Sequence, residues 1–238
     1  MKTRLRVIGL FLSVGFLATS CGGLKVPGAS STTSSRSTQP GGDPREDLKK
    51  AFTAQLAAKS FRYRMNFESS FLSGSHVESE FVAPDRYHLT MIGQSPAPGR
   101  DISQEMIITG KDTFMKIGDM PWRRTEINSG ETQATIIARM AQQFRATDVE
   151  QRMTKYEDVR FVGHEALDGS PALVYQFKLK GAEGQSSGKI WISASDGLPR
   201  KIENDGGTSP NPNGETSKSK LIVTYYDYNA NIRIEPPI

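Results

Sequence analysis

Phe61-Arg62-Tyr63-Arg64-Met65-Asn66-Phe67-Glu68 is the stretch of this 238-residue chain that decides the fold. Apolar and polar side chains alternate through it without a break, and a period of two is typical of a β-strand with one apolar and one solvated face. The alternation shows which side chains share a face, but not which face of the resulting sheet is concave. A strand of this kind pairs with other strands, and we expect these in the sequence on either side of it.

Similar apolar runs, separated by turn signals such as Pro84-Asp85, Asp168-Gly169 and Asp196-Gly197, predict further strands before and after this one. We expect Asn204 to Ser219, which is rich in Gly and Pro, to be a loop that breaks the last pairing, and Ile232 and Ile234 are candidates to extend the final strand. The predicted strands are His76–Val82, Tyr87–Met91, Ile102–Thr109, Thr113–Ile117, Val159–Gly163, Ala172–Leu179, Lys189–Ala194, Pro199–Glu203 and Leu221–Tyr228.

Two helices are predicted among these strands. Asp43-Pro44-Arg45-Glu46 is a start signal with an N-cap residue and a proline in the first turn, and Leu48, Phe52 and Leu56 follow as one apolar stripe. Ser129-Gly130-Glu131 begins the second helix, whose apolar side is formed by Ile136, Ile137, Met140 and Phe144.

This order of elements predicts the fold class. About ten antiparallel strands, with one helix before them and one inserted midway, exclude a doubly wound parallel sheet. We expect a mainly β (α+β) domain over residues 43–238, in which about 10–11 strands form one large curved antiparallel sheet, a half-barrel, covered by the two helices.

The N-terminus predicts an address outside the cytoplasm. Lys2, Arg4 and Arg6 precede an apolar segment that leads into Ala18-Thr19-Ser20-Cys21, which is similar to the lipobox of bacterial lipoproteins. We expect residues 1–20 to be a signal peptide, and residues 21–42 to be an acylated Cys21 with a disordered Ser/Thr/Gly linker. The anchor would hold the domain on the cell membrane or the outer membrane. An ordinary secretory signal or a short uncleaved anchor are the alternatives.

Composition excludes several function classes. The net charge of +4 comes mostly from the signal segment, since 30 basic residues less its three leave 27 against 26 acidic ones. A near-neutral surface gives no electrostatic basis for nucleic-acid binding. Acylation of the single cysteine leaves no thiol for a disulfide or zinc, and the three histidines lack metal-ligand spacing. We expect a monomer without cofactor or metal.

Several motifs, taken in their order along the chain, carry a resemblance to a known family. They are Phe81–Tyr87, Met115–Asp119 with Pro121-Trp122, Gly163–Gly169, Lys189–Ile192, Asp196–Lys201 and Tyr225–Asn229. This layout is similar to the LolA/LolB lipoprotein-carrier superfamily and, with the lipobox, closest to the LppX/LprG group of lipid-binding lipoproteins. The resemblance implies a half-barrel of about eleven strands with helices over its concave face, enclosing an apolar cavity for acyl chains.

Methionine side chains are unbranched and adapt to ligands of variable shape, so methionines on consecutive strands are candidates to line such a cavity. The alternative is that they, and the aromatic residues near them, only fill the core. Trp122, Arg123 and Arg124 are candidates for the cavity rim, where they would meet a lipid headgroup; otherwise they form an exposed strand end. The cavity candidates are Phe61, Tyr63, Met65, Phe67, Tyr87, Leu89, Met91, Met106, Ile108, Met115, Ile136, Met140 and Phe144.

An enzyme is not expected. Gly184-Gln185-Ser186-Ser187-Gly188 matches the G-x-S-x-G pattern, but that nucleophile elbow requires a helix after the serine, whereas a strand follows here. The sequence therefore predicts a membrane-anchored protein that binds acyl chains for carriage or presentation. The alternative is an envelope interaction or sensor module that uses the same sheet without transport, and a hydrolase is the third hypothesis.

Overall fold

The computed structural model describes residues 42–68, 75–94, 101–125, 148–180, 186–210 and 216–237, all within one compact unit. Its helices are α1 (Pro44–Leu56) and α3 (Val149–Met153). Its strands are β1 (Ser60–Glu68), β2 (His76–Val82), β3 (Arg86–Gln94), β4 (Asp101–Thr109), β5 (Asp112–Ile117), β6 (Arg123–Thr125), β7 (Tyr156–Leu167), β8 (Ser170–Leu179), β9 (Ser186–Ser193), β10 (Pro199–Pro210) and β11 (Thr216–Tyr226).

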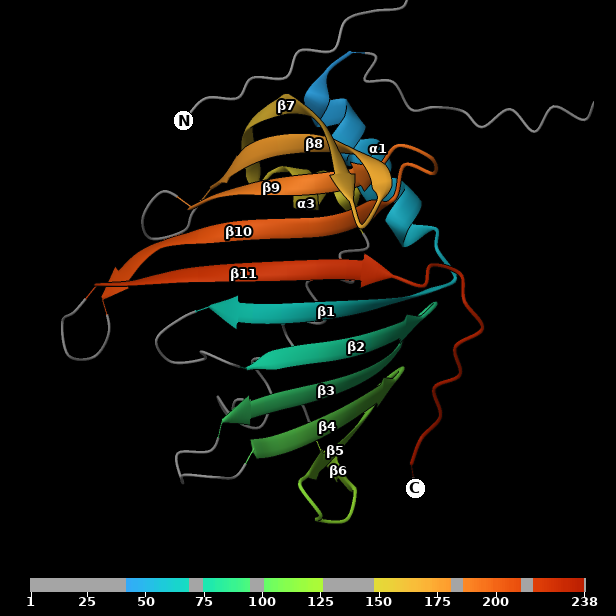
Figure 1. Cartoon of the computed structure of the whole chain (residues 1–238). Helices are drawn as coiled ribbons and strands as arrows, with labels where there is room; N and C mark the ends of the chain where they lie inside the picture. Colours follow the sequence, from blue (N-terminus) through green and yellow to red (C-terminus); the bar gives the residue numbers. More distant parts are fainter. Residues whose placement is uncertain are drawn as a thin grey trace, which may run out of the picture. The chain divides into compact units, whose positions relative to one another are not determined.

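The strands form a single antiparallel sheet of eleven strands in the order β6-β5-β4-β3-β2-β1-β11-β10-β9-β8-β7. The two end strands, β6 and β7, do not pair with each other, so the sheet stays open (Figure 1). Both halves are meanders of consecutive strands, and the first and last strands of the chain join them at the centre. The predicted mainly β fold with one large antiparallel sheet is confirmed.

Helix α1 begins and ends as its sequence predicts. The Asp43 side chain accepts a hydrogen bond from the backbone N–H of Arg45 at 2.9 Å, and Pro44 occupies the first turn. Leu48 and Phe52 are fully buried against the sheet, and the helix contacts β7, β10 and α3. Figure 1 shows α1 and α3 on the same side of the β7–β10 half. We call this side of the sheet the inner face.

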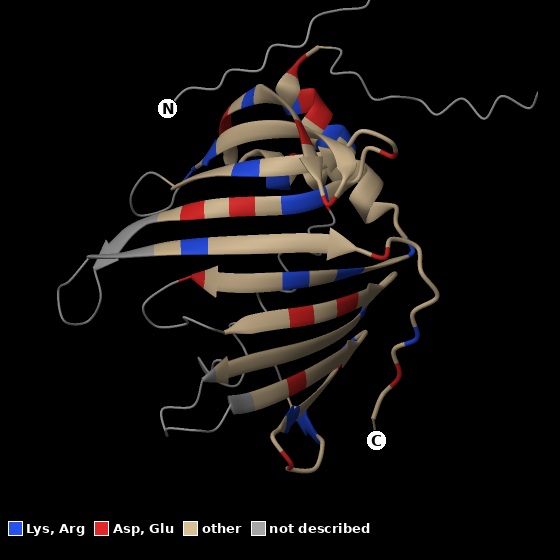
Figure 2. Cartoon of the chain, viewed as in Figure 1, with Lys and Arg blue, Asp and Glu red and all other residues tan. Residues whose placement is uncertain are grey.

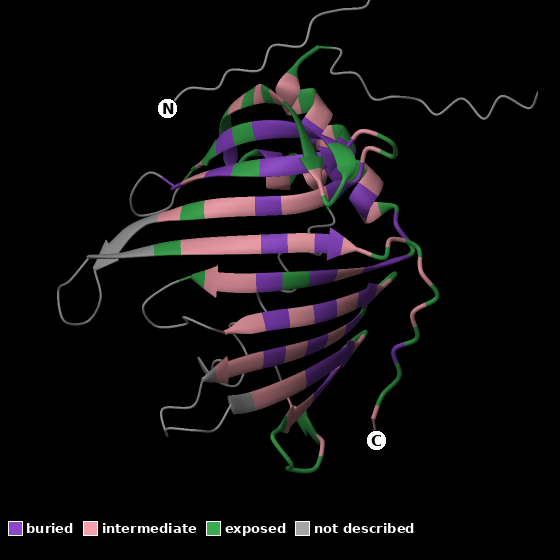
Figure 3. Cartoon of the chain, viewed as in Figure 1, coloured by how far each residue is buried: buried purple, intermediate pink, exposed green. Residues whose placement is uncertain are grey.

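Burial settles which residues face inward. Phe61, Tyr63 and Met65 of β1 belong to the same buried cluster as Leu48 and Phe52 of α1. Their neighbours on β1 point outward. Figure 3 shows the resulting alternation of buried and partly exposed positions along β1 to β3. The alternating stretch Phe61–Glu68 therefore places its apolar side chains on the inner face.

Charges of both signs lie along the strands, and the basic residues of β1 stand beside the acidic residues of β2 (Figure 2). Arg62 of β1 pairs with Glu80 of β2 at 2.7 Å, and Lys116 of β5 pairs with Glu105 of β4 at 3.1 Å. These are cross-strand pairs of the kind that stabilise a solvated sheet face. An apolar ligand would therefore find its surface on the inner face.

Three local predictions were wrong. The predicted loop Asn204–Ser219 is largely strand, because β10 continues to Pro210 and β11 begins at Thr216. Ile232 and Ile234 do not extend the last strand: the chain after Tyr226 is irregular, and Ile234 is buried on the outer face against Ile107 and Phe114. Helix α3 was not expected. The predicted helix from Ser129 lies outside the described residues.

Within the described ranges, no helix combines the length and the apolar character needed to cross a membrane.

Candidate functional site

The strand register lines inner-face side chains up in rows across the sheet. Tyr63 of β1 lies opposite Ser79 of β2 on one side and opposite Tyr225 of β11 on the other. Leu89, Met106 and Met115 continue the row through the next three strands. The row crosses six strands. Ser79 is the one small polar residue in it, and the other members are apolar or aromatic. The inner face is therefore a continuous apolar surface.

Most predicted cavity residues come together on this surface. Phe67 is half-buried and packs against the buried cluster, and Met115 is half-buried opposite Met106. Contact of any of them with a ligand remains a prediction. Ile136, Met140 and Phe144 lie outside the described residues. The predicted residues within the buried cluster are Phe61, Tyr63, Met65, Tyr87, Leu89, Met91, Met106 and Ile108.

The three rim candidates separate in the structure. Arg123 lies on the end strand β6, opposite Met115 and thus in register with the inner-face row. Arg124 is in register with Phe114, whose side chain belongs to the outer face, and it forms an ion pair with Asp112. Trp122 packs against the outer cluster of Ile107, Phe114 and Ile234. Of the three, Arg123 alone shares a face with the cavity candidates.

Arg45 links the helices to each other and to the sheet. Its Nη1 donates to the carbonyl of Tyr156 and its Nη2 to the carbonyl of Met153, each at 2.6 Å. The Met153 carbonyl lies at the end of α3, where helix carbonyls lack partners within the helix, so a cation satisfies it well. The hydroxyl of Tyr175 donates to Asp47 of α1 at 3.0 Å. Polar contacts thus fix α1 over the inner face.

A charged side chain of α3 packs against the aromatic part of this surface. The guanidinium of Arg152, on α3, lies 3.6 Å from the centroid of the Phe52 ring, and its Nη1 donates to Oε1 of Gln55 at 3.3 Å. Gln55 itself is 4% exposed. The sequence analysis missed this group because it missed α3. Asp148, which accepts hydrogen bonds from the N–H groups of Glu150 and Gln151, was the signal that could have located the helix.

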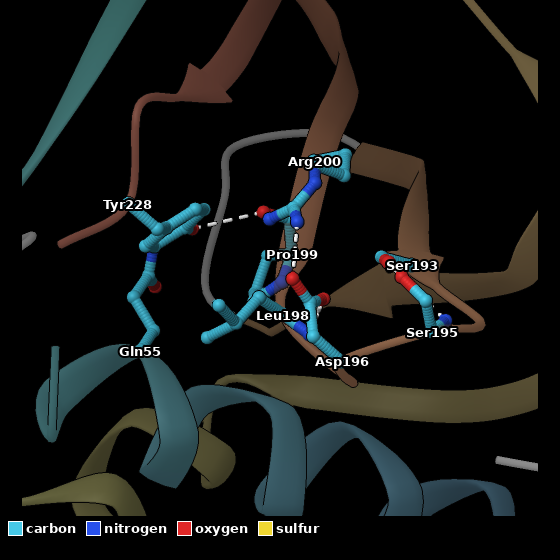
Figure 4. A network of polar contacts seen from close by, with 8 residues as sticks. All are labelled: Gln55, Ser193, Ser195, Asp196, Leu198, Pro199, Arg200 and Tyr228. Carbon is cyan, nitrogen blue, oxygen red and sulfur yellow. Dashed lines mark hydrogen bonds and ion pairs between the residues drawn. The ribbon is translucent and has the colours of Figure 1, made fainter. Parts of the chain in front are cut away.

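Figure 4 shows how Gln55 is held. Its Nε2 donates to the hydroxyl of Tyr228 at 3.1 Å, and that hydroxyl donates to the carbonyl of Pro199 at 2.8 Å. The Arg200 guanidinium lies 5.0 Å from the Tyr228 ring centroid and pairs with Asp196 at 2.5 Å. With its amide nitrogen committed to Tyr228, Gln55 presents its amide oxygen to Arg152.

The inner tyrosines stay protonated far into the alkaline range. Burial raises the pKa of Tyr225 to about 12, and Arg152 opposes this shift. Burial likewise raises the pKa values of Tyr63 and Tyr228. A neutral buried hydroxyl remains a hydrogen-bond donor at any physiological pH.

Ser186 and Gly188 of the G-x-S-x-G pattern have structural roles. Ser186 is 4% exposed, and its hydroxyl donates to the carbonyl of Asp205 at 3.0 Å. At Gly188 an added Cβ would lie 2.3 Å from the carbonyl oxygen of Glu203, so the glycine allows β9 and β10 to approach. Both residues lie on strand β9. Within the described ranges no group of three or more His, Cys, Asp or Glu side chains is placed to hold a metal ion.

A hollow of about 400 Å³ lies at the ends of β8, β9 and β11. Ser193, Ser195, Asp168, Asp196 and Asp227 supply its polar lining. Asp196 and Asp227 are already paired, with Arg200 and Arg62. Leu167, Pro171 and Ala172 supply apolar lining, and none of the predicted cavity residues lines this hollow.

An open antiparallel sheet of eleven strands with helices packed on its inner face is a half-barrel, which confirms the fold class predicted from the sequence. No family model and no curated protein matches the chain.

Two solved structures share this fold over nearly their whole length. The lipoprotein LppX of Mycobacterium tuberculosis matches with a TM-score of 0.55 at 11% identity, over 81% of this chain and 98% of LppX. LprF of Mycobacterium bovis matches with a TM-score of 0.57 at 12% identity, over 82% of this chain and 96% of LprF. At such low identity the likeness concerns the fold alone.

Proposed function

We propose that this protein is a membrane-anchored extracytoplasmic lipoprotein that binds the acyl chains of a lipid or lipoprotein, for carriage or presentation. The observation that carries the proposal is the continuous apolar inner face, on which eight of the predicted cavity residues join one cluster. LppX, which shares the fold, is a lipoprotein, and this supports the anchored part of the proposal.

The driving force would be burial of the ligand's chain. Each methylene that leaves water contributes about 0.8 kcal/mol, so affinity is expected to rise with chain length. Met65, Met91, Met106 and Met115 supply side chains that can adjust to chains of different shape. A binding protein of this kind needs no reacting group, and we propose no catalysis.

The anchor would be Cys21. Two or three acyl chains hold a protein on a bilayer far more firmly than a single chain. A flexible linker of about 20 residues has a root-mean-square reach of roughly 25 Å, which would let the domain meet lipid at the surface. Replacement of Cys21 by Ser should abolish fatty-acid labelling and release the protein from membranes; labelling that persists would place the anchor elsewhere.

Native mass spectrometry of the chain purified from a bacterial envelope tests the binding function. We expect a population with one co-purified lipid, identified by its fragmentation. Met115→Glu, which puts a charge on the inner face at a half-buried position, should reduce that population. Val162→Glu is the matched control, because Val162 is 48% exposed on end strand β7. A lipid-free mass for the parent chain would overturn the proposal.

A further inference from the structure

Arg152 is a partly buried cation whose charge is not balanced. Its contacts are the Phe52 ring and the amide oxygen of Gln55, both neutral. Among the described residues it forms no salt bridge, whereas the nearest acidic side chain of its own helix, Glu150, pairs with Lys49. A cation that is shielded from water without a counter-charge is costly to fold. The position therefore suits an anionic partner that arrives from outside the chain.

A second, independent group lies at the same place. The hydroxyl of Tyr225, a residue only 2% exposed, meets no group that would accept its proton. Burial raises the pKa of Tyr225, and Arg152 and Gln55, which lie beside its oxygen as donors, oppose this shift. A buried hydroxyl without a partner costs roughly 1–3 kcal/mol, which a ligand that accepts its hydrogen bond would recover. A cation without a counter-charge and a buried hydroxyl without an acceptor for its proton thus lie side by side at the inner face.

From this convergence we infer that the ligand is an acidic lipid, whose carboxylate or phosphate oxygen binds to Arg152 and Tyr225 while its chain lies on the inner face. The assignment rests on the proposed function and adds the chemical class of the ligand. Mostly apolar sites with a few fixed polar groups commonly select ligands in this way. Gln55, held by Tyr228, would orient the guanidinium and is a positioning residue.

Oleate and oleyl alcohol have the same chain and differ in the charged head, so they are matched probes. The purified full chain carries Cys21→Ser, so that its own acyl groups cannot occupy the site, and affinity is measured by displacement of a fluorescent fatty alcohol. Because a charge-assisted hydrogen bond is strong in a low-dielectric site, oleate should bind about 10-fold more tightly than the alcohol. Sodium acetate, which lacks the chain, should not compete.

Three variants test which residues give the preference for oleate over oleyl alcohol. Arg152→Met should weaken oleate binding about 10-fold and leave alcohol binding unchanged, and Arg152→Lys should restore part of the preference as a point charge. Tyr225→Phe should weaken oleate binding several-fold. Arg160→Met removes an exposed arginine of β7 and is the control, with no expected effect.

The outcomes separate the two proposals. If neither probe binds the parent chain, the proposed lipid-binding function fails. If both bind equally, or if Arg152→Met keeps the preference for oleate, lipid binding stands and the acidic-lipid assignment is overturned. Competition by acetate at concentrations similar to oleate would assign the site to a small anion and overturn it as well.

Discussion

Tyr63 of β1 lies directly opposite Tyr225 of β11, with 6.0 Å between their ring centroids. In the sheet as described, β1 and β11 are the one pair of neighbouring strands that are not consecutive in the chain. The two tyrosines therefore join the N-terminal meander to the C-terminal one. Both side chains are almost fully buried in the inner cluster.

A double-mutant cycle should detect this connection. Tyr63→Leu and Tyr225→Leu are each expected to destabilise the protein, and their coupling energy should be about 0.5–1.5 kcal/mol, as for other aromatic pairs. Urea unfolding of the four proteins gives the value. Tyr226→Leu is the control, because Tyr226 lies opposite Arg62 in the register and belongs to the other face. Coupling of equal size between Tyr63 and Tyr226 would contradict a direct ring contact.

Alkaline pH should unfold the protein through its buried tyrosines. The pKa of Tyr225 is about 12 in the folded state and about 10 in the unfolded chain, so the folded state holds this proton more tightly. Stability is therefore unaffected below about pH 10, and falls as the pH rises from 10 to 12. The loss from this residue is about 2–3 kcal/mol, and Tyr63 and Tyr228 act in the same direction.

Urea unfolding at pH 8, 10 and 12 measures this loss, and tyrosinate absorbance follows the titration. Tyr225→Phe lacks the ionisable group, so its stability should fall less over the same range. A parent chain and a Tyr225→Phe variant with identical pH profiles would show that Tyr225 titrates normally.

Arg45 should matter more for stability than any exposed ion pair near it. Arg45→Met removes the donor to the Met153 carbonyl, at the end of α3, and to the Tyr156 carbonyl, at the start of β7, and hydrogen bonds to a charged group contribute about 1.5–3 kcal/mol. Lys49→Met removes the exposed pair with Glu150 and should cost clearly less, because solvent screens such a pair. Hydrogen exchange of the α3 amides should speed up in Arg45→Met alone. Equal effects of the two substitutions would refute this ranking.

Periodicity predicted the parts of the fold that depend on local alternation. The strand around Tyr63 and helix α1, with its Asp43 cap, follow directly from their residue patterns. Strand β10 was underestimated because Gly206 and Gly207 look like a loop, whereas the register shows a bulge between Gly206 and Thr208 inside a continuing ladder.

The polar part of the candidate site could not be predicted in the same way. Arg152 and Gln55 are 97 positions apart and meet only because Arg45 holds α3 against α1. Such contacts depend on packing between segments far apart in the sequence. Hydrophobic periods of two residues for a strand and 3.6 for a helix do not predict them. That the candidates of β1 to β4 share one face, by contrast, could be predicted, because alternation alone assigns them to it.

Substitutions at Gly188 and Ser186 should separate a strand role from a nucleophile role. Gly188→Ala puts a methyl group against the Glu203 carbonyl and the Phe177 ring, so it should destabilise the protein by about 1–3 kcal/mol. Ser186→Ala removes one buried hydrogen bond and should cost about 1 kcal/mol. Thermal unfolding gives both values. A Ser186→Ala variant that is fully stable but loses an esterase activity of the parent would restore the hydrolase hypothesis.

The C-terminal segment should act as a strap that stabilises the β3–β5 end of the sheet from outside. Figure 1 shows the chain after β11 running past the ends of the neighbouring strands toward β4 and β5. Nη1 of Arg86, on β3, donates to the carbonyl of Ile234 at 2.8 Å, and the Ile234 side chain is 4% exposed. Because truncation of a buried isoleucine removes apolar contact and leaves a cavity, Ile234→Ala should cost about 2–4 kcal/mol.

Ile232→Ala is the matched control for this strap, since Ile232 is only half-buried beside the same cluster and should cost clearly less. Hydrogen exchange localises the effect: amides of β4 and β5 should lose protection in Ile234→Ala, while those of β8 and β9, at the other end of the sheet, should keep theirs. Uniform loss of protection over the whole sheet would mean that Ile234 supports global stability, and that the strap has no separate role at this end.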